Sequence, residues 1–179
     1  RDDTNHFIGG RSYGLSKLHT KRSIDGFKHR DILINKSFEL SPYLNFGCLS
    51  VREVYQYFYR HKIPAAKELH WRDFFQCILR YKPGASSYTH PMDSRFRAIK
   101  WRSVKSKQSV HEWISFIECR TGYLLIDAGM RQLQSTGYIG NRMRLLLATF
   151  WTKYLMIDPL NHEYGAQSGF SRLLTDCST

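Results

Sequence analysis

The sequence lacks several features that would assign it to particular protein classes. None of its apolar runs approaches the ~18 residues of a membrane-spanning helix, so we expect no membrane partner. No segment sustains the alternation of apolar and polar residues that marks a half-buried strand. No internal repeat is present either. These absences favour a mostly helical domain.

The chain has only four cysteines, and no two of them have the C-x-x-C spacing of a zinc or redox site. A domain of 179 residues can bury enough apolar surface to fold without disulfides. We therefore predict no metal site and four reduced, mostly buried thiols in an intracellular protein. The cysteines are Cys48, Cys77, Cys119 and Cys177.

Acidic residues are also few, since 15 Asp and Glu face 27 Lys and Arg, and the formal net charge is +12. That charge favours a polyanionic partner: a nucleic acid, an anionic membrane surface or a phosphorylated cofactor. The 42% of hydrophobic and 15% of aromatic residues predict a folded domain rather than a disordered basic tail. Because the sequence begins at Arg1 without an initiator methionine, we expect a piece of a longer protein.

Capping and stop signals predict an all-α domain over residues 37–179, preceded by a polar, irregular arm over residues 1–36. Two S-x-x-E capping boxes, at Ser50 and at Ser109, each predict a helix start. Gly137 is expected to end a helix in the left-handed conformation. The predicted helices cover residues 51–61, 64–81, 109–119, 123–134 and 141–156.

An amide and two guanidinium groups lie at the start of the last predicted helix, in the segment TGYIGNRMRLL. On a helix that begins at Asn141, the side chains of Asn141 and Arg144 share a face, whereas Arg142 points aside. The free N–H groups of a first helical turn attract negative charge. Asn141 and Arg144 are therefore expected to converge on an anion or on the polar edge of a heteroaromatic ring. The alternative is a structural ion pair of Arg144 with Asp127 or Asp176.

A second candidate is a helical stripe in the segment KELHWRDFF, where Glu68, Trp71, Arg72 and Phe75 follow the i, i+3, i+4, i+7 spacing. Aromatic rings interleaved with an acid and a base suit stacking on a planar base whose edges are hydrogen-bonded. The alternative is that the stripe packs in the core, although core faces rarely carry both an acid and a base. A third, weaker candidate is the segment Ser37–Ser41, whose hydroxyl and N–H groups precede a helix and can hold phosphate oxygens.

Four segments occur in the order that is typical of the photolyase/cryptochrome family. They are LSPYLNFGCLSVREV, KELHWRDFF, RTGYLLIDAGMRQLQSTGYIGNRMRLLLATFWTKYLMID and LLTDCS. Over about residues 30–178 the sequence resembles the helical, FAD-binding C-terminal domain of that family. An antenna pigment, where a member has one, would bind a domain outside this sequence.

The resemblance implies FAD as the cofactor, held by two groups of residues. The group that would wrap the FAD phosphates is Ser37, Phe38, Glu39, Leu40 and Ser41, with Arg72 beside them. The group that would face the flavin is Tyr138, Asn141 and Arg144, with Asp176 paired to Arg144 and with Ser178 where many members have Asp.

The resemblance also implies DNA that contains pyrimidine dimers as the partner. Trp71 would stack on a dimer flipped out of the duplex, while Glu68 and Asn141 would hydrogen-bond the polar edges of the dimer as the catalytic contacts. The other DNA contacts that it implies are Arg30, Arg72, Phe75 and Arg142. Trp101 would be the outer station of an electron-transfer chain to the flavin, and Pro159 stands where the family usually has the middle Trp of that chain.

The function implied by the resemblance is light-driven repair of cyclobutane pyrimidine dimers with reduced FAD, by a monomer that works where the cell keeps its DNA. One alternative is a cryptochrome-type flavin photoreceptor, which signals through partners. Another is an inactive basic helical remnant that binds nucleic acid without flavin.

Overall fold

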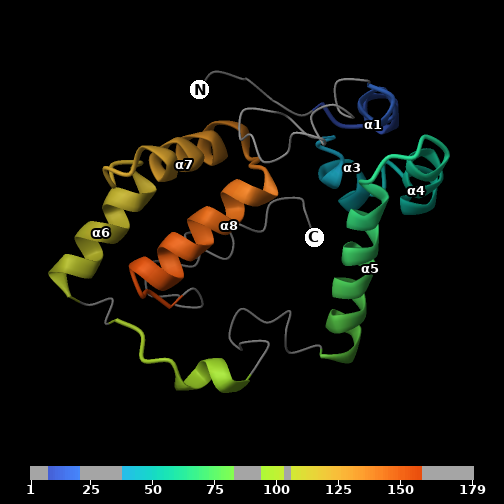
Figure 1. The fold of residues 1–179 in the computed structure, drawn as a ribbon. Coiled ribbons are helices and arrows are strands. Elements are labelled where there is room, and N and C mark those ends of the chain that lie inside the picture. Colours follow the sequence, from blue (N-terminus) through green and yellow to red (C-terminus); the bar gives the residue numbers. More distant parts are fainter. Residues whose placement is uncertain (1–7, 21–37, 83–93, 103–105, 159–179) are drawn as a thin grey trace. The chain divides into compact units, whose positions relative to one another are not determined.

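The computed structural model describes residues 8–20, 38–82, 94–102 and 106–158 of the 179-residue chain. Within these ranges the secondary structure is helical and contains no strand, which confirms the all-α prediction. The helices belong to two compact units, which comprise residues 1–81 with 177–179 and residues 82–176. Figure 1 labels the helices of both units. The predicted domain boundary between residues 36 and 37 lies outside the described residues.

The described residues of the first unit form four helices, and the core forms where α4 meets the residues before it. The helices are α1 (Arg11–Leu18), α3 (Ser41–Asn45), α4 (Val51–Arg60) and α5 (Ala66–Tyr81). Val54 and Phe58, four residues apart on α4, are almost completely buried. The ring of Phe38 packs on that of Phe58 with centroids 4.7 Å apart. The apolar stripe of α4 therefore holds the segment before α3 in place.

Helix α1 corrects the prediction of an irregular N-terminal arm, which is wrong for residues 11–18. Leu18 is only 1% exposed and belongs to the core of the first unit. A Cβ on Gly14 would lie 3.0 Å from side-chain atoms of both Tyr43 and Leu49, so α1 approaches these residues closely. Local sequence signals did not indicate this helix, because it is largely polar and is held by tertiary contacts of a few residues such as Gly14 and Leu18.

The second unit contains η2 (Ser94–Ala98), α6 (Lys107–Ile117), α7 (Leu124–Thr136), α8 (Asn141–Thr149) and the π-helical turn η3 (Phe150–Tyr154). In this unit, α6 packs on α7, α7 on α8 and α8 on η3. Helix α7 contacts both α6 and α8 (Figure 1). Phe116, Met130 and Leu147, one from each of these helices, are fully buried together.

The helix ends agree with the sequence signals in some places and differ in others. Gly137 ends α7 with φ 69°, as predicted. Ser50 precedes α4, but its side chain makes no capping hydrogen bond. Helix α6 begins at Lys107, two residues earlier than predicted, because the hydroxyl of Ser106, rather than that of Ser109, accepts the capping hydrogen bond. The hydroxyl of Ser109 is buried, and it accepts from the Ser106 hydroxyl at 2.8 Å.

Two further predictions about the chain need correction. The helix predicted over residues 141–156 is α-helical only to Thr149, and its last turn is a π-helix that ends at Tyr154. Among the described cysteines, which are all free thiols, Cys119 is buried and Cys48 partly buried, but Cys77 is exposed. The prediction of buried thiols is therefore wrong for Cys77, and Cys177 lies outside the described residues.

Candidate functional site

Helix α5 presents an exposed aromatic face. A turn with hydrogen bonds from Lys67 N–H to the Pro64 carbonyl and from Glu68 N–H to the Ala65 carbonyl starts the helix. Of its 16 residues only Leu69 is buried, so α5 is attached to its unit by its first turns. Trp71 is 59% and Phe75 52% exposed, with ring centroids 6.4 Å apart. These two rings are therefore not part of the core of the first unit.

The polar members of the same stripe accompany the rings. Glu68 lies one turn before Trp71 on α5, and its residue is exposed. The side chain of Arg72 is 29% exposed, and its guanidinium Nη1 lies 3.9 Å from the carboxylate of Asp73. At this distance the ion pair is weak, so the guanidinium retains N–H donors for an anion. The spacing prediction that placed an acid, a base and two rings on one face is consistent with their exposure.

The segment before α3 is shaped mainly by burial. Phe38 and Leu40 are 6% and 5% exposed, so their side chains serve the core and only their backbone could meet a phosphate. Glu39 has a positive φ of 50°, and its carboxylate accepts a hydrogen bond from the Lys17 ammonium at 2.5 Å. Helix α1 thereby fixes Glu39, which lies between Phe38 and Leu40, and the sequence did not indicate this contact. Ser41, the first residue of α3, is partly exposed.

In the second unit, the start of α8 carries the amide and guanidinium groups. The chain leaves α7 at Gly137, and the Thr136 hydroxyl accepts from the Tyr138 N–H at 3.1 Å and so tightens the turn. Asn141 is the first residue of α8 and is exposed. Arg144 is partly buried, and its Nη2 donates to the Ile139 carbonyl at 3.1 Å. The first-turn N–H groups of α8 point away from the helix body, as in any helix N-terminus.

Asp127, which the sequence suggested as a partner of Arg144, has different partners. Its carboxylate accepts hydrogen bonds from the Thr121 N–H at 2.9 Å, the Thr121 hydroxyl at 2.6 Å and the Gly122 N–H at 3.2 Å. Burial alone would raise the pKa of Asp127, but these hydrogen bonds outweigh it and hold the pKa below its ordinary value. Asp127 therefore fixes the turn before α7, and the alternative in which it pairs with Arg144 is wrong.

The remaining predicted residues lie in several places. Trp101 is partly buried next to Arg102, whose guanidinium donates to Glu112 at 2.8 Å and to the Leu155 carbonyl at 3.1 Å. Tyr138 is partly buried, and Arg142 is exposed. The predicted residues that lie outside the described part of the chain are Arg30, Ser37, Pro159, Asp176 and Ser178.

Two further properties concern only the residues that the structure describes. No group of three or more His, Cys, Asp or Glu side chains in these ranges is arranged to hold a metal ion. No helix there is long and apolar enough to cross a membrane.

Comparison with known proteins decides the family. The sequence model of the FAD-binding domain of DNA photolyase matches residues 65–179. The chain belongs to the photolyase/cryptochrome family. Its domain is thus of the FAD-binding type, and FAD is the cofactor of this family domain.

Similar proteins agree with this assignment. The chain is 31% identical to a deoxyribodipyrimidine photo-lyase of Alkalihalophilus pseudofirmus, over 93% of this chain and 35% of the relative. It is 38% identical to one of Streptomyces griseus, over 73% of this chain and 28% of the relative. A photolyase structure from Sulfolobus tokodaii, solved with two FAD molecules, has a TM-score of 0.75 at 36% identity and covers 97% of this chain and 37% of its own. The chain thus spans about a third of the length of these family members.

The described donors fit FAD chemically, each unit by itself. In the first unit, the Arg72 guanidinium can meet a phosphate, because Asp73 engages it only at 3.9 Å. In the second unit, the Asn141 amide and the first-turn N–H groups of α8 offer donors for the carbonyl and ring-nitrogen edge of a flavin. Arg72 is partly exposed and Asn141 is exposed, so both side chains are accessible.

Proposed function

We propose that the protein to which this chain belongs repairs cyclobutane pyrimidine dimers in DNA, using light and reduced FAD. The family membership supports a photolyase- or cryptochrome-type activity. One observation about this chain favours repair: α5 carries Trp71 and Phe75 as exposed rings on the same stripe as Glu68. Exposed rings that lie together on one helix face mark an interaction surface, and rings of this kind can stack on bases.

In this proposal the cofactor is held by residues of both motif groups. Ser37–Ser41 and Arg72 bind the phosphates, with Phe38 and Leu40 contributing only backbone groups because their side chains are buried. Tyr138, Asn141 and Arg144 contact the flavin, and Asp176 and Ser178 complete that set. When bound, the reduced cofactor supplies an electron upon absorbing light, and the electron returns after the dimer has split.

The chain's own residues would bind and orient the substrate. A dimer stacks poorly on its neighbours, so flipping it out of the duplex costs less than flipping an intact base. Trp71 stacks on the flipped dimer, and Glu68 hydrogen-bonds its polar edge together with Asn141. Phe75 extends the apolar wall beside Trp71, with ring centroids 6.4 Å apart. Arg30 and Arg142 contact phosphates of the flanking strand. Trp101 has a separate role, as the outer residue of an electron-transfer chain to the flavin.

The test is the binding of dimer-containing and undamaged duplexes by the full-length protein. Because stacking on a base is worth ~1–3 kcal/mol, Trp71→Ala should weaken binding to the dimer about tenfold or more. Binding to undamaged duplex should change little, since phosphate contacts act on both DNAs alike. Tyr81→Ala is the matched control, because Tyr81 is an exposed ring (81%) at the other end of α5.

Two results would contradict the proposal. Equal losses on both DNAs would show that Trp71 does not recognise the dimer and would favour a cryptochrome-type photoreceptor. A purified protein without flavin absorbance would favour a nucleic-acid-binding remnant.

Glu68→Gln should slow light-driven repair more than it weakens binding, if Glu68 contacts the dimer as proposed.

A further inference from the structure

The outer face of α4 carries residues that take no part in the proposed contacts with FAD or with the dimer. Its buried side is formed by Val54 and Phe58. The other side carries five residues spaced i, i+3, i+4, i+7 and i+8, which places them on one helical face. They are Arg52, Tyr55, Gln56, Tyr59 and Arg60. We refer to this stripe, together with His70 of α5, as the α4 outer face.

Three rings of the α4 outer face form a continuous row. Tyr55 and Tyr59 are nearly parallel, with an interplanar angle of 18° and centroids 6.1 Å apart. His70 packs on Tyr55 from α5, with centroids 5.5 Å apart. Tyr59 ends the row and is 72% exposed. A row of this kind leaves one aromatic face open for a further planar group to stack.

The charge around the rings is positive. Arg52, Arg60, Lys62 and Lys67 are exposed, and none of them has an ion-pair partner within the described residues. The only acidic residue between positions 51 and 67 is Glu53. Its carboxylate is occupied by the Arg11 guanidinium, with N–O distances of 2.7 and 3.0 Å. Arg52, Arg60 and Lys62 thus lie in a segment whose one carboxylate is already engaged, whereas Lys67 is followed by Glu68 on α5.

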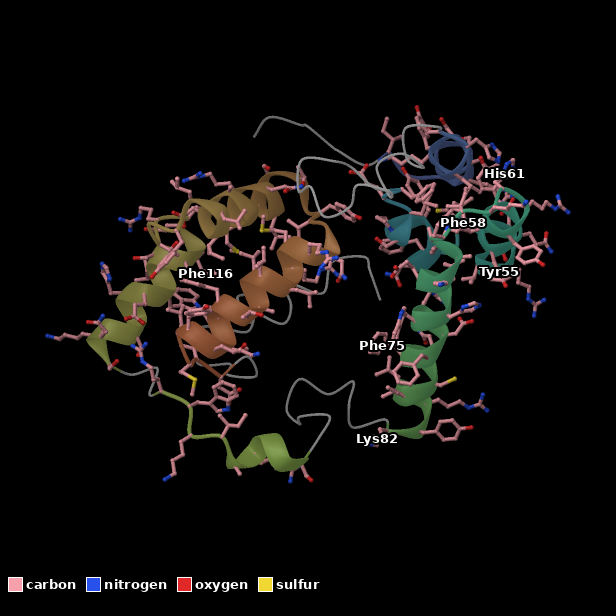
Figure 2. All side chains as sticks on the ribbon, in the orientation of Figure 1. Tyr55, Phe58, His61, Phe75, Lys82 and Phe116 are labelled. Atoms are coloured by element: carbon pink, nitrogen blue, oxygen red, sulfur yellow. The ribbon has the colours of Figure 1, made fainter. Side chains whose placement is uncertain are left out.

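This face is separate from the Trp71 face. Figure 2 shows Phe75 projecting from α5 on the side away from α4, whereas Tyr55 lies where α4 approaches α5. On α5, His70 contacts Tyr55, while Trp71 contacts Phe74 edge-to-face and Phe75 at a tilt. The two ring sets therefore belong to different surfaces of the first unit.

We propose that the α4 outer face binds single-stranded DNA, outside the proposed dimer contacts. Exposed rings stack on bases, and unpaired cations meet the phosphates between them, which is the arrangement of proteins that bind single strands without sequence preference. A duplex hides the faces of its bases, so it could use only the cations. A membrane surface would require a broad apolar face to insert, and here the apolar atoms are those of two tyrosines. The family acts on DNA, so we commit to DNA rather than RNA.

The test measures binding of an undamaged oligothymidylate to the full-length protein by fluorescence anisotropy. Tyr59→Ala removes the open ring and should weaken binding about tenfold, whereas Tyr59→Phe keeps the stack and should restore it. Arg52→Gln with Arg60→Gln should reduce the slope of log Kd against log salt by about 1.4, that is about 0.7 for each phosphate contact. Tyr81→Ala and Arg80→Gln are the matched controls, because both residues are exposed on α5 away from this face. Circular dichroism checks that each variant is folded.

The alternative outcomes are distinct. Equal losses for Tyr59→Ala and Tyr81→Ala, or equal losses on single strands and on duplex, would overturn the proposal. Tighter binding of oligouridylate than of oligothymidylate would assign the face to RNA and refute the DNA assignment. Loss of binding to phosphatidylserine vesicles with unchanged binding to DNA would assign it to a membrane. Repair of a dimer is not the readout, so failure here leaves the proposed function untouched.

Discussion

Substitution of Gly129 by alanine tests how closely α7 and α8 pack beneath Asn141 and Arg144. Gly129 is buried in α7. A Cβ at this position would lie 2.4 Å from Sδ and 2.8 Å from Cγ of Met143, a buried residue of α8. Such distances do not occur between atoms that are not bonded, so Met143 must move.

Two effects of opposite sign set the magnitude. Alanine in a helix interior is favoured over glycine by ~1 kcal/mol. Overpacking in a core costs ~1–3 kcal/mol. The clash involves Cγ of Met143, which is close to the backbone, and the side chain is only 6% exposed, so it cannot simply swing into solvent. The upper part of the cost therefore applies, and the net destabilisation should be about 1–2 kcal/mol.

Hydrogen exchange of the α7 and α8 amides measures this local stability without requiring two-state unfolding of the whole protein. Gly129→Ala should accelerate their exchange by about 5- to 30-fold. In a Met143→Ala background the clash is absent, so adding Gly129→Ala should leave exchange unchanged or slow it. Gly9→Ala, at a position with no atom within 4 Å, is the control. Slower exchange in the otherwise unchanged protein, or equal acceleration in both backgrounds, would refute the packing argument.

Three further predictions concern single polar groups. Ser106→Ala should destabilise α6 by about 1 kcal/mol, while Ser50→Ala should have little effect on α4, because only the Ser106 side chain makes a capping hydrogen bond; amide exchange near each helix start compares them. The pKa of Asp127 is lowered on folding, so its contribution to stability is present above about pH 4 and is lost as the pH falls through the folded pKa. Asp127→Asn should therefore make the free energy of unfolding depend less on pH in that range. An unchanged dependence would contradict this. The hydrogen bonds from Arg11 lower the pKa of Glu53, so Arg11→Gln should raise it toward its ordinary value in a carboxyl NMR titration, and no change would show that the pair does not persist in solution.

The sequence predicted well those features that depend on residues a few positions apart. The end of α7 at Gly137 follows from the ability of glycine to adopt a positive φ. The position of α4 follows from its apolar stripe and the extended Ser50 before it. The family motifs also identified the FAD-binding type of the domain, which the comparisons confirm.

Prediction failed where distant residues compete for the same group. The S-x-x-E spacing at Ser109 resembles a capping box, but tertiary contacts bury Ser109 and draw Glu112 to Arg102. Spacing alone could not show whether Asp127 would meet Arg144 or the turn before α7. Short-range sequence patterns do not show which of two possible partners a polar side chain will bind, because the partners lie on different helices or turns.

By itself, the sequence determined the helical class, the helix ends marked by glycine and the positive charge, since each depends on local conformation or on composition. Only the tertiary structure decided that α1 packs through Leu18, that Trp71 and Phe75 face solvent and that Asp127 binds Thr121 and Gly122. Helical periodicity groups residues on a face, but it does not say whether that face will be buried. Burial depends on which other surfaces the folded chain brings against it, and these lie far away in the sequence.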